Sequence, residues 1–119
     1  MIYKICLRQH WDAALAAGRY AGAGIDRRDG YIHFSAAHQV RETAKRHFAG
    51  QRDLVLVAVD DGRLGDGLKW EMSRGGALFP HLYGSLDVRH AVHVYDLPLA
   101  ENGQHTFPAD LAHDDVADA

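Results

Sequence analysis

The order of apolar segments along the 119 residues predicts a single α+β domain. Strand-like and helix-like segments alternate over the first half of the chain, and strand-like segments follow one another over the second half. An uninterrupted apolar run at 54–59 is typical of a central strand covered on both faces. From Pro98 onward the apolar pattern fades. We therefore expect one domain over residues 1–97 and an acidic, weakly ordered tail over 98–119.

The first half predicts two strands, each followed by a helix. The expected elements are a strand at 2–7, a helix at 9–17, a loop at 18–30, a strand at 31–35 and a helix at about 36–49. Gly18 is expected to cap the first helix at its C-terminus, and Ser35 to cap the second at its N-terminus. The inner stripe expected for the second helix is Ala37, Val40, Ala44, His47 and Phe48.

The second half predicts a series of strands. They are expected at 54–59, 68–72, 78–83 and 91–97, with a glycine loop over 73–77. Pro80 has no N–H to donate to a neighbouring strand. It therefore favours an edge or corner position for the segment 78–83.

Composition predicts a soluble, cytoplasmic protein. The single cysteine, Cys6, excludes an intramolecular disulfide, lies in an apolar run and is expected to be a packed side chain. No apolar run has the length of a membrane span, and the N-terminus lacks the pattern of a signal peptide, so we expect no membrane partner. The net charge is −3, but the first 99 residues carry +2. This weak charge is no signature of duplex DNA binding, although a phosphate-bearing small ligand stays compatible with it.

The segment Leu68–Gly84 gathers the densest polar chemistry of the chain. An acid, a cation, an imidazole and a phenol lie close together in sequence, around two glycines and a Phe-Pro corner: Glu71, Arg74, His81 and Tyr83. A segment that only packs rarely needs this set. The segment is therefore a candidate functional site, with the rest of the chain as its scaffold.

Each polar candidate also has a purely structural interpretation. His33 and Ser35 lie on one face of the expected strand and can line a cleft, or they can be a core histidine and a capping serine. Glu71 can act as a general base or accept a ribose hydroxyl, or it can pair with Arg74 or Lys69. His81 and Tyr83 can line the cleft, or they can be an exposed histidine and a packing residue.

Two other classes of site are disfavoured. The chain has nine histidines, but no His-Glu-x-x-His or paired-cysteine spacing, so we expect no metal site. It also lacks the Gly-x-Ser-x-Gly turn of serine hydrolases. An acid–base pair of Glu71 and His81 in a small hydrolase or isomerase is a weaker alternative.

Four sequence blocks carry a resemblance to a known family. They are Ile-Tyr-Lys-Ile at the N-terminus, Trp11 with Ala14, Asp-Gly-Tyr-Ile-His-Phe-Ser at 29–35, and Leu-Lys-Trp-Glu-Met-Ser-Arg-Gly-Gly-Ala-Leu-Phe-Pro-His-Leu-Tyr-Gly at 68–84. Through them the chain resembles, over roughly residues 1–97, the bacterial family called domain of unknown function 952. That family is similar in fold to ADP-ribosyltransferases, including RNA 2′-phosphotransferases that consume NAD.

The resemblance implies an ADP-ribosyltransferase-like fold, in which a split, twisted pair of small sheets encloses a nicotinamide-nucleotide cleft. It implies catalytic roles for His33 and Glu71, and a ribose- or phosphate-binding position at about Lys4. Many members carry histidine where this chain has Lys4, and lysine is a flexible point charge rather than a neutral hydrogen-bond acceptor. This departure favours binding over transfer.

We therefore expect a cleft that binds a nucleotide or NAD-like phosphorylated ligand, with transfer of ADP-ribose or phosphate as the activity in question. The residues expected to bind the ligand are Lys4, Ser35, Arg74, His81 and Tyr83, beside the catalytic His33 and Glu71. NAD is the expected substrate, RNA is a weaker candidate partner, and the chain is expected to be a monomer or a homodimer. The rival hypothesis is a non-catalytic binding or interaction module on the same fold.

Overall fold

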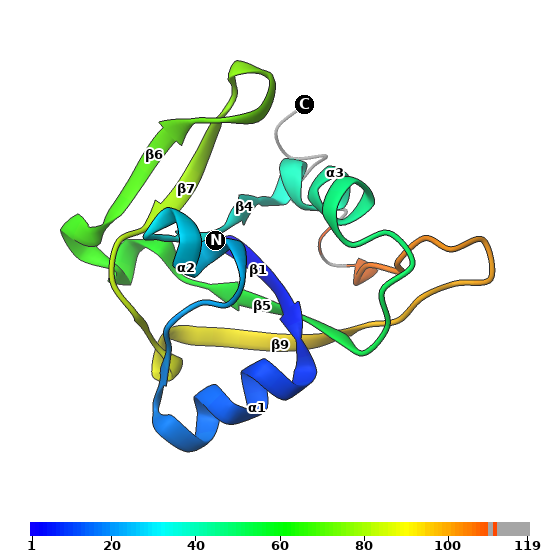
Figure 1. Ribbon diagram of the computed structural model, residues 1–119, viewed down its shortest axis with the longest axis horizontal. Coiled ribbons are helices and arrows are strands. Elements are labelled where there is room, and N and C mark those ends of the chain that lie inside the picture. The colour runs from blue at the N-terminus through cyan, green and yellow to red at the C-terminus, as the bar shows by residue number, and fades with distance from the viewer. Residues whose placement is uncertain (110, 112–119) are drawn as a thin grey trace.

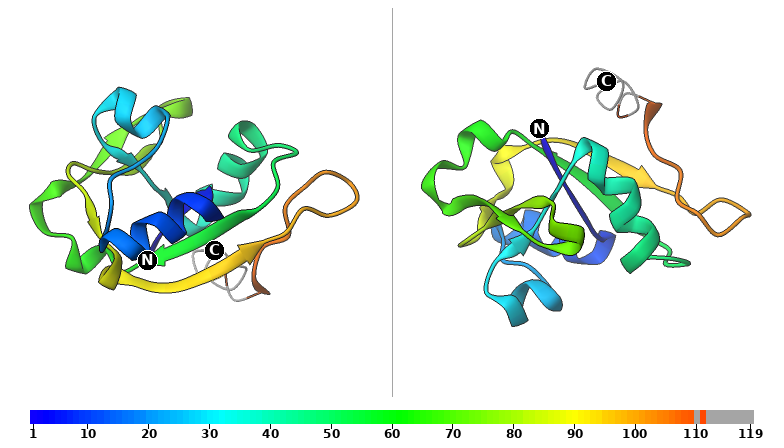
Figure 2. Two further views of the ribbon diagram at one scale, coloured as in Figure 1. Left: turned by 60° about the horizontal axis from the view of Figure 1, so that its bottom comes forward. Right: turned by 90° about the horizontal axis from the view of Figure 1, so that it is seen from above.

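The core is built on a four-stranded antiparallel sheet with the strand order β4-β1-β5-β9 (Figure 1). Its strands are β1 (Ile2–Leu7), β4 (Ser35–Ala36), β5 (Leu54–Val59) and β9 (Ala91–Leu97). All six residues of β5 are buried, because β1 and β9 flank this strand and both sheet faces are covered. The predicted central strand is thus confirmed. Figure 2 shows β9 along one border of the molecule, beside β5.

Alternation along β1 and β5 divides the core between the two faces of this sheet. Ile2 and Cys6 pack with α1 (Arg8–Ala17) through Trp11 and Ala14. The opposite face packs against α3 (Ala37–His47). Its core residues are Tyr3, Ile5, Leu54, Leu56 and Ala58 of the sheet, with Val40 and Ala44 of the helix. Lys4 lies on the same face as Ile2 and Cys6, within an otherwise apolar stripe.

A second, three-stranded antiparallel sheet has the order β3-β7-β6. Its strands are β3 (Ile32–His33), β7 (Leu78–Leu82) and β6 (Leu68–Met72). The single strand predicted at 31–35 is wrong, because the chain passes from one sheet to the other at Phe34. His33 pairs with His81 in the second sheet, whereas Ser35 pairs with Tyr3 in the first. This crossing places His33 and Ser35 in different sheets.

The loop predicted over residues 18–30 contains two short elements. β2 (Arg19–Tyr20) pairs with β8 (Leu86–Asp87), and α2 (Ile25–Asp29) follows. Both depend on distant partners, since Tyr20 is buried in the core and Asp26 of α2 is buried against Lys4. Local glycine content could not reveal these contacts. Gly18 does adopt the left-handed conformation of the predicted helix cap, with φ of 85°.

Three further predictions about individual residues are wrong. Ser35 is not a helix cap: its hydroxyl bonds to Thr43, and the Ala36 N–H at the start of α3 donates to the Gln39 side chain instead. His47 is exposed, although it was placed in the inner stripe. Pro80 lies in the middle strand of its sheet rather than at an edge. It is tolerated because its carbonyl accepts the Phe34 N–H where β3 has already ended, and no ladder bond there requires an N–H from Pro80.

The structure is a computed structural model that describes residues 1–109 and 111, without the side chain of Arg74. Short 3-10 turns lie at Asp61–Arg63, Gly65–Gly67, Arg74–Gly76 and Val88–His90. In the expected tail, Leu99 forms a β-bridge with His105, and Leu111 is buried in the core that α3 covers. Residues 110 and 112–119 of the tail lie outside the described part. Within the described part, no helix is long and apolar enough to cross a bilayer.

Candidate functional site

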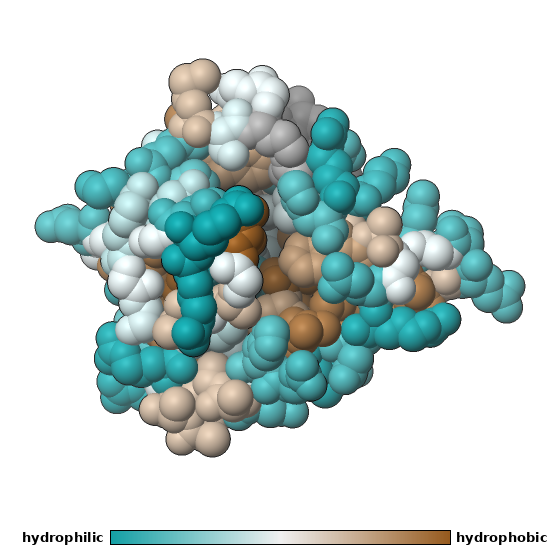
Figure 3. Space-filling view, in the orientation of Figure 1, coloured by the Kyte–Doolittle hydropathy of each residue, from teal (hydrophilic) through white to brown (hydrophobic). Residues whose placement is uncertain are grey.

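A cleft of about 730 Å³ lies between the two sheets, a size that suits a small-molecule ligand. Residues from β1, α2, β3, β4, α3 and β7 line it. In Figure 3 the centre of this face is hollowed, with hydrophobic colouring at its floor and hydrophilic residues around its rim. Four of the residues predicted from sequence line the cleft: Lys4, His33, Ser35 and His81. Glu71 and Tyr83 stand behind His81.

A buried ion pair lies at the cleft floor. The Lys4 Nζ donates to both carboxylate oxygens of Asp26, at 2.8 and 3.1 Å, and the two residues are 8% and 2% exposed. Burial raises the pKa of Asp26, but the hydrogen bonds from His33 and the charge of Lys4 outweigh it and bring the pKa to about 2. Asp26 is therefore ionised and neutralises Lys4. The predicted phosphate-binding lysine already has a carboxylate partner.

His33 is held between two carboxylates. Its Nδ1 lies 2.6 Å from Asp26 Oδ1, and its Nε2 lies 3.0 Å from Asp29 Oδ2. The His33 backbone N–H also donates to Asp26, at 3.0 Å. Carboxylate oxygens only accept, so the imidazole completes both bonds when each of its nitrogens carries a hydrogen. The ring is thus fixed in orientation at the cleft wall.

His81 forms a second histidine–carboxylate unit. Its Nδ1 lies 2.8 Å from Glu71 Oε1, which also accepts the Tyr83 hydroxyl at 2.7 Å. The bonds from His81 and Tyr83 lower the pKa of Glu71, and the bond to Glu71 raises the pKa of Tyr83. His81 is buried and lines the cleft while Glu71 does not, so the imidazole separates the carboxylate from the cleft. Glu71 is placed to orient His81.

Tyr31 brings the two histidine units together. Its ring stacks on His81, with centroids 4.1 Å apart and planes inclined by 26°, and it also contacts His33 at 4.6 Å and Tyr83 at 5.2 Å. The centroids of His33 and His81 are 5.5 Å apart in an edge-on arrangement. The four rings therefore form one packed cluster, in which Tyr31, His33 and His81 line the cleft.

The other two predicted ligand-binding residues differ in position. The Ser35 hydroxyl lies 2.8 Å from Thr43 Oγ1, so it joins β4 to α3 at the far side of the cleft. Arg74 belongs to the turn between β6 and β7, and its side chain lies outside the described part of the structure.

Sequence reasoning missed Asp26, Asp29 and Tyr31. Asp26 and Asp29 lie in the segment 18–30, which was interpreted as a loop without a partner. One signal was available: Lys4 falls within the strand at 2–7, where a buried ammonium requires a carboxylate. The spacing alone could not show which of the acids supplies it.

The apolar part of the cleft includes Cys6 and Tyr20. Burial raises the pKa of the Cys6 thiol to about 11, which agrees with a packed cysteine and not a nucleophile. The Tyr20 hydroxyl is buried and has no hydrogen-bond partner within the described part of the chain. Burial also raises the pKa of Tyr20, so this hydroxyl stays protonated and available as a donor.

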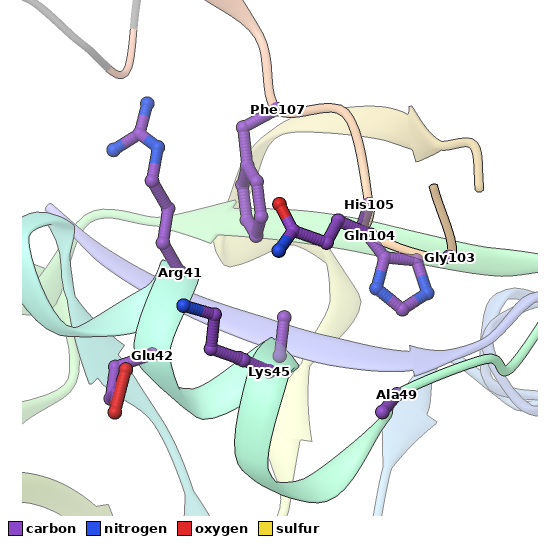
Figure 4. Close-up of a pocket in the computed structure, with 9 residues that line it drawn as sticks. Arg41, Glu42, Lys45, Ala49, Gly103, Gln104, His105 and Phe107 are labelled. Atoms are coloured by element: carbon purple, nitrogen blue, oxygen red, sulfur yellow. The ribbon is translucent and has the colours of Figure 1, made fainter. Parts of the chain in front are cut away.

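A second hollow of about 430 Å³ lies between α3 and the segment that follows β9 (Figure 4). Arg41 and Lys45 of α3 face Phe107 across it, and the Arg41 guanidinium carbon lies 5.3 Å from the Phe107 ring centroid. It contains none of the residues predicted as site residues. Residues 1–109 and 111 contain no group of three or more His, Cys, Asp or Glu side chains arranged to hold a metal ion.

The Asp26 pair makes a prediction about acid stability. The pKa of Asp26 is lowered from 3.8 to about 2, so the folded state binds its proton more weakly than the unfolded state does. The resulting stabilisation, about 2 kcal/mol, is complete above the unfolded pKa and is lost as the pH falls from about 4 to about 2. Urea unfolding across this range measures it. In Asp26→Asn, the loss of stability over this window should be smaller by that amount, and an unchanged pH dependence would contradict the assignment.

The fold and the site together define a class: a small mixed α/β domain whose antiparallel sheets flank a cleft bearing two carboxylate-bound histidines. The chain belongs to the family described as Protein of unknown function (DUF952), whose model matches residues 5–94. The family membership expected from the sequence blocks is thereby confirmed.

Solved structures of one bacterial protein are similar to this chain over most of its length. The crystal structure of protein CC0527 from Caulobacter crescentus is 50% identical, with a TM-score of 0.89 over 93% of this chain and 97% of that chain. The solution NMR structure of CC0527 is 52% identical, with a TM-score of 0.78 over 87% of this chain and 89% of that chain. No curated protein matches the chain.

Proposed function

We propose that the cleft between the two sheets binds a nucleotide-like phosphorylated ligand, with NAD or ADP-ribose as the first candidates. The observation that carries the proposal is the convergence of His33 and His81, from adjacent strands, on a cleft of about 730 Å³. A nucleotide needs an aromatic surface for its base and several hydrogen-bond donors for its ribose and phosphates. Tyr31, Phe79 and the histidines supply these groups at one site.

The balance of charges at the cleft floor governs how a phosphate is recognised. Lys4 is compensated by Asp26, and His33 faces both Asp26 and Asp29. A phosphate therefore meets no strong positive field, and its binding depends little on long-range attraction. In this proposal His33 and Ser35 exchange their bonds to Asp29 and Thr43 for bonds to the ribose or phosphate, and Arg74 pairs with the phosphate.

The proposal includes an ADP-ribosyltransferase-like relationship of the fold. Two small antiparallel sheets flank the cleft, and the chain crosses between them at Phe34, which supports the split pair of sheets that the resemblance implies. The proposed activity is transfer of ADP-ribose or phosphate, in the cytoplasm. In that activity, Glu71 acts through His81 and not by direct contact with the ligand, because its carboxylate bonds to the imidazole behind the cleft wall.

A second candidate is a binding module that has the same cleft and no catalytic turnover. Two observations favour it. The ammonium of Lys4 is already neutralised by Asp26, and the carboxylate of Glu71 already accepts bonds from His81 and Tyr83. The two candidates differ in product formation and share ligand binding.

Calorimetric titration with NAD and with ADP-ribose tests the shared part. We expect saturable binding, and we expect His33→Ala to weaken it by about tenfold or more, because charge-assisted hydrogen bonds are lost. The matched control is His93→Ala, at an exposed position on β9 away from the cleft lining. No heat and no thermal shift at millimolar ligand would overturn the proposal.

Glu71→Gln separates the two candidates. If the protein is a transferase, this variant retains the ligand affinity and loses most of its turnover, since glutamine lacks the carboxylate that orients the His81 imidazole. Product formation from NAD, followed by chromatography, is the measurement. If the wild-type protein binds NAD and releases no product, the result supports the non-catalytic binding module.

A further inference from the structure

The second sheet exposes a self-complementary strand at its edge. β6 has β7 on one side, and within the described residues no strand pairs with its other side. Figure 1 shows β6 at the rim of the molecule. An edge strand carries unpaired N–H and C=O groups, which can pair with another strand.

Two backbone hydrogen bonds establish which groups of β6 face the open edge. At the two ends of the hairpin, the Ser73 N–H donates to the Ala77 carbonyl at 2.9 Å, and the Tyr83 N–H donates to the Gly67 carbonyl at 2.8 Å. Hydrogen-bonded pairs recur at every second residue of an antiparallel ladder, so Lys69 and Glu71 also bond inward to β7. The N–H and C=O groups of Leu68, Trp70 and Met72 therefore point to the open side.

The side chains of this edge are apolar and exposed. Trp70 is 43% exposed and Met72 is 71% exposed on one face of β6, and Leu78, opposite Met72 on β7, is 51% exposed. This patch continues from Leu68 and Leu82, which pack against or within the core. Large apolar side chains grouped at an unpaired edge are characteristic of an interaction surface.

The charge pattern of β6 fits a second copy of the same strand. In an antiparallel pair of two β6 strands related by a two-fold axis through Trp70, Lys69 of each chain lies opposite Glu71 of the other. Leu68 lies opposite Met72, and the two Trp70 side chains form a cross-strand aromatic pair. Lys69 is exposed and the Glu71 side chain is 38% exposed. Oε1 of Glu71 accepts from His81 and Tyr83, so Oε2 is the atom that would accept from Lys69 of the second copy. Residues 68–72 are thus apolar, basic, aromatic, acidic and apolar in turn. Two antiparallel copies of this sequence place each residue opposite one that it can pair with.

The other long edge strand lacks this property. In β9, a two-fold axis through Val94 would place the apolar Val92 opposite the acidic Asp96, so this strand is not complementary to itself. We propose that the protein forms a homodimer through antiparallel pairing of its β6 strands, which joins two three-stranded sheets into one of six. Because a five-residue strand makes a small interface, the dimer dissociates in the micromolar to millimolar range.

Sedimentation velocity of the full chain tests this proposal. We expect a concentration-dependent monomer–dimer equilibrium that weakens with added salt. In the Lys69→Glu variant, the new glutamate of each chain lies opposite Glu71 of the other chain. We expect this repulsion to raise the dissociation constant by about tenfold or more. Glu71→Lys should have the same effect. The decisive sample is an equimolar mixture of the two variants, which restores complementary pairs and should form a heterodimer.

Two further variants make the outcomes unambiguous. Trp70→Pro removes an N–H that points to the open edge, so it should abolish dimerisation while circular dichroism and melting show a folded chain. Val94→Lys on β9 should leave the dimer unchanged. A chain that stays monomeric throughout the concentration range overturns the proposal. So does a mixture that fails to associate, or a dimer that only Val94→Lys disrupts.

Discussion

Replacing Asp26 by alanine is expected to lower the free energy of unfolding by about 3–5 kcal/mol. The variant leaves the Lys4 ammonium buried without a partner and removes an acceptor from the side chain and the backbone N–H of His33. The Lys4 ammonium is only 8% exposed, so water replaces its lost bond poorly. Urea unfolding at neutral pH measures the change.

Arg46→Ala is the control for this prediction. Arg46 pairs with Glu42 at 3.1 Å on the outer face of α3, where both side chains are more than half exposed. Loss of such a pair changes stability by about 0.5 kcal/mol or less. If Asp26→Ala were as mild as Arg46→Ala, the buried ion pair would not be a structural element of the cleft floor.

Leu56→Ala is expected to cost about 2–5 kcal/mol of stability. Leu56 lies fully buried in the middle of β5, between β1 and β9, and packs in the core that α3 covers. The lost contacts leave a cavity that strands on both sides keep from collapsing. Chemical unfolding monitored by circular dichroism gives the value.

The matched control for Leu56 is Leu15→Ala on α1. Leu15 is 52% exposed, so the same truncation removes little buried surface and should cost less than about 1 kcal/mol. Equal losses at the two positions would contradict the central place of β5.

The strands that could be predicted are those whose apolar run or apolar–polar alternation lies entirely within the strand's own residues. β1, β5, β6 and β9 have the expected bounds, because an unbroken apolar run or a regular alternation identifies a strand without its partner. β3 and β4 were merged, since nothing local shows that Phe34 passes between two sheets. β2 and α2 were missed because their stability comes from Leu86 and Lys4, which lie far away in the sequence.

In the candidate site, too, local sequence patterns could be predicted and contacts between distant residues could not. Polar residues in apolar strands indicated His33, His81 and Glu71, and the structure brings these three together. Their roles stay predictions. The sequence could not show that Asp26 neutralises Lys4, because this pairing depends on where α2 packs. Nor could it show that His81 stands between Glu71 and the cleft, because this order depends on side-chain direction within β6 and β7.

The passage of the chain between the two sheets has a consequence for the cleft. Only Phe34 separates β3 from β4, and its N–H is bound to the Pro80 carbonyl. The sheets are therefore tethered at the cleft wall by a single residue, and they cannot move apart unless the pairing at His33 or at Ser35 breaks. At this wall the spacing of the two sheets is set by the span of one residue. A substitution at Phe34 is therefore expected to act on both sheets that line the cleft at once.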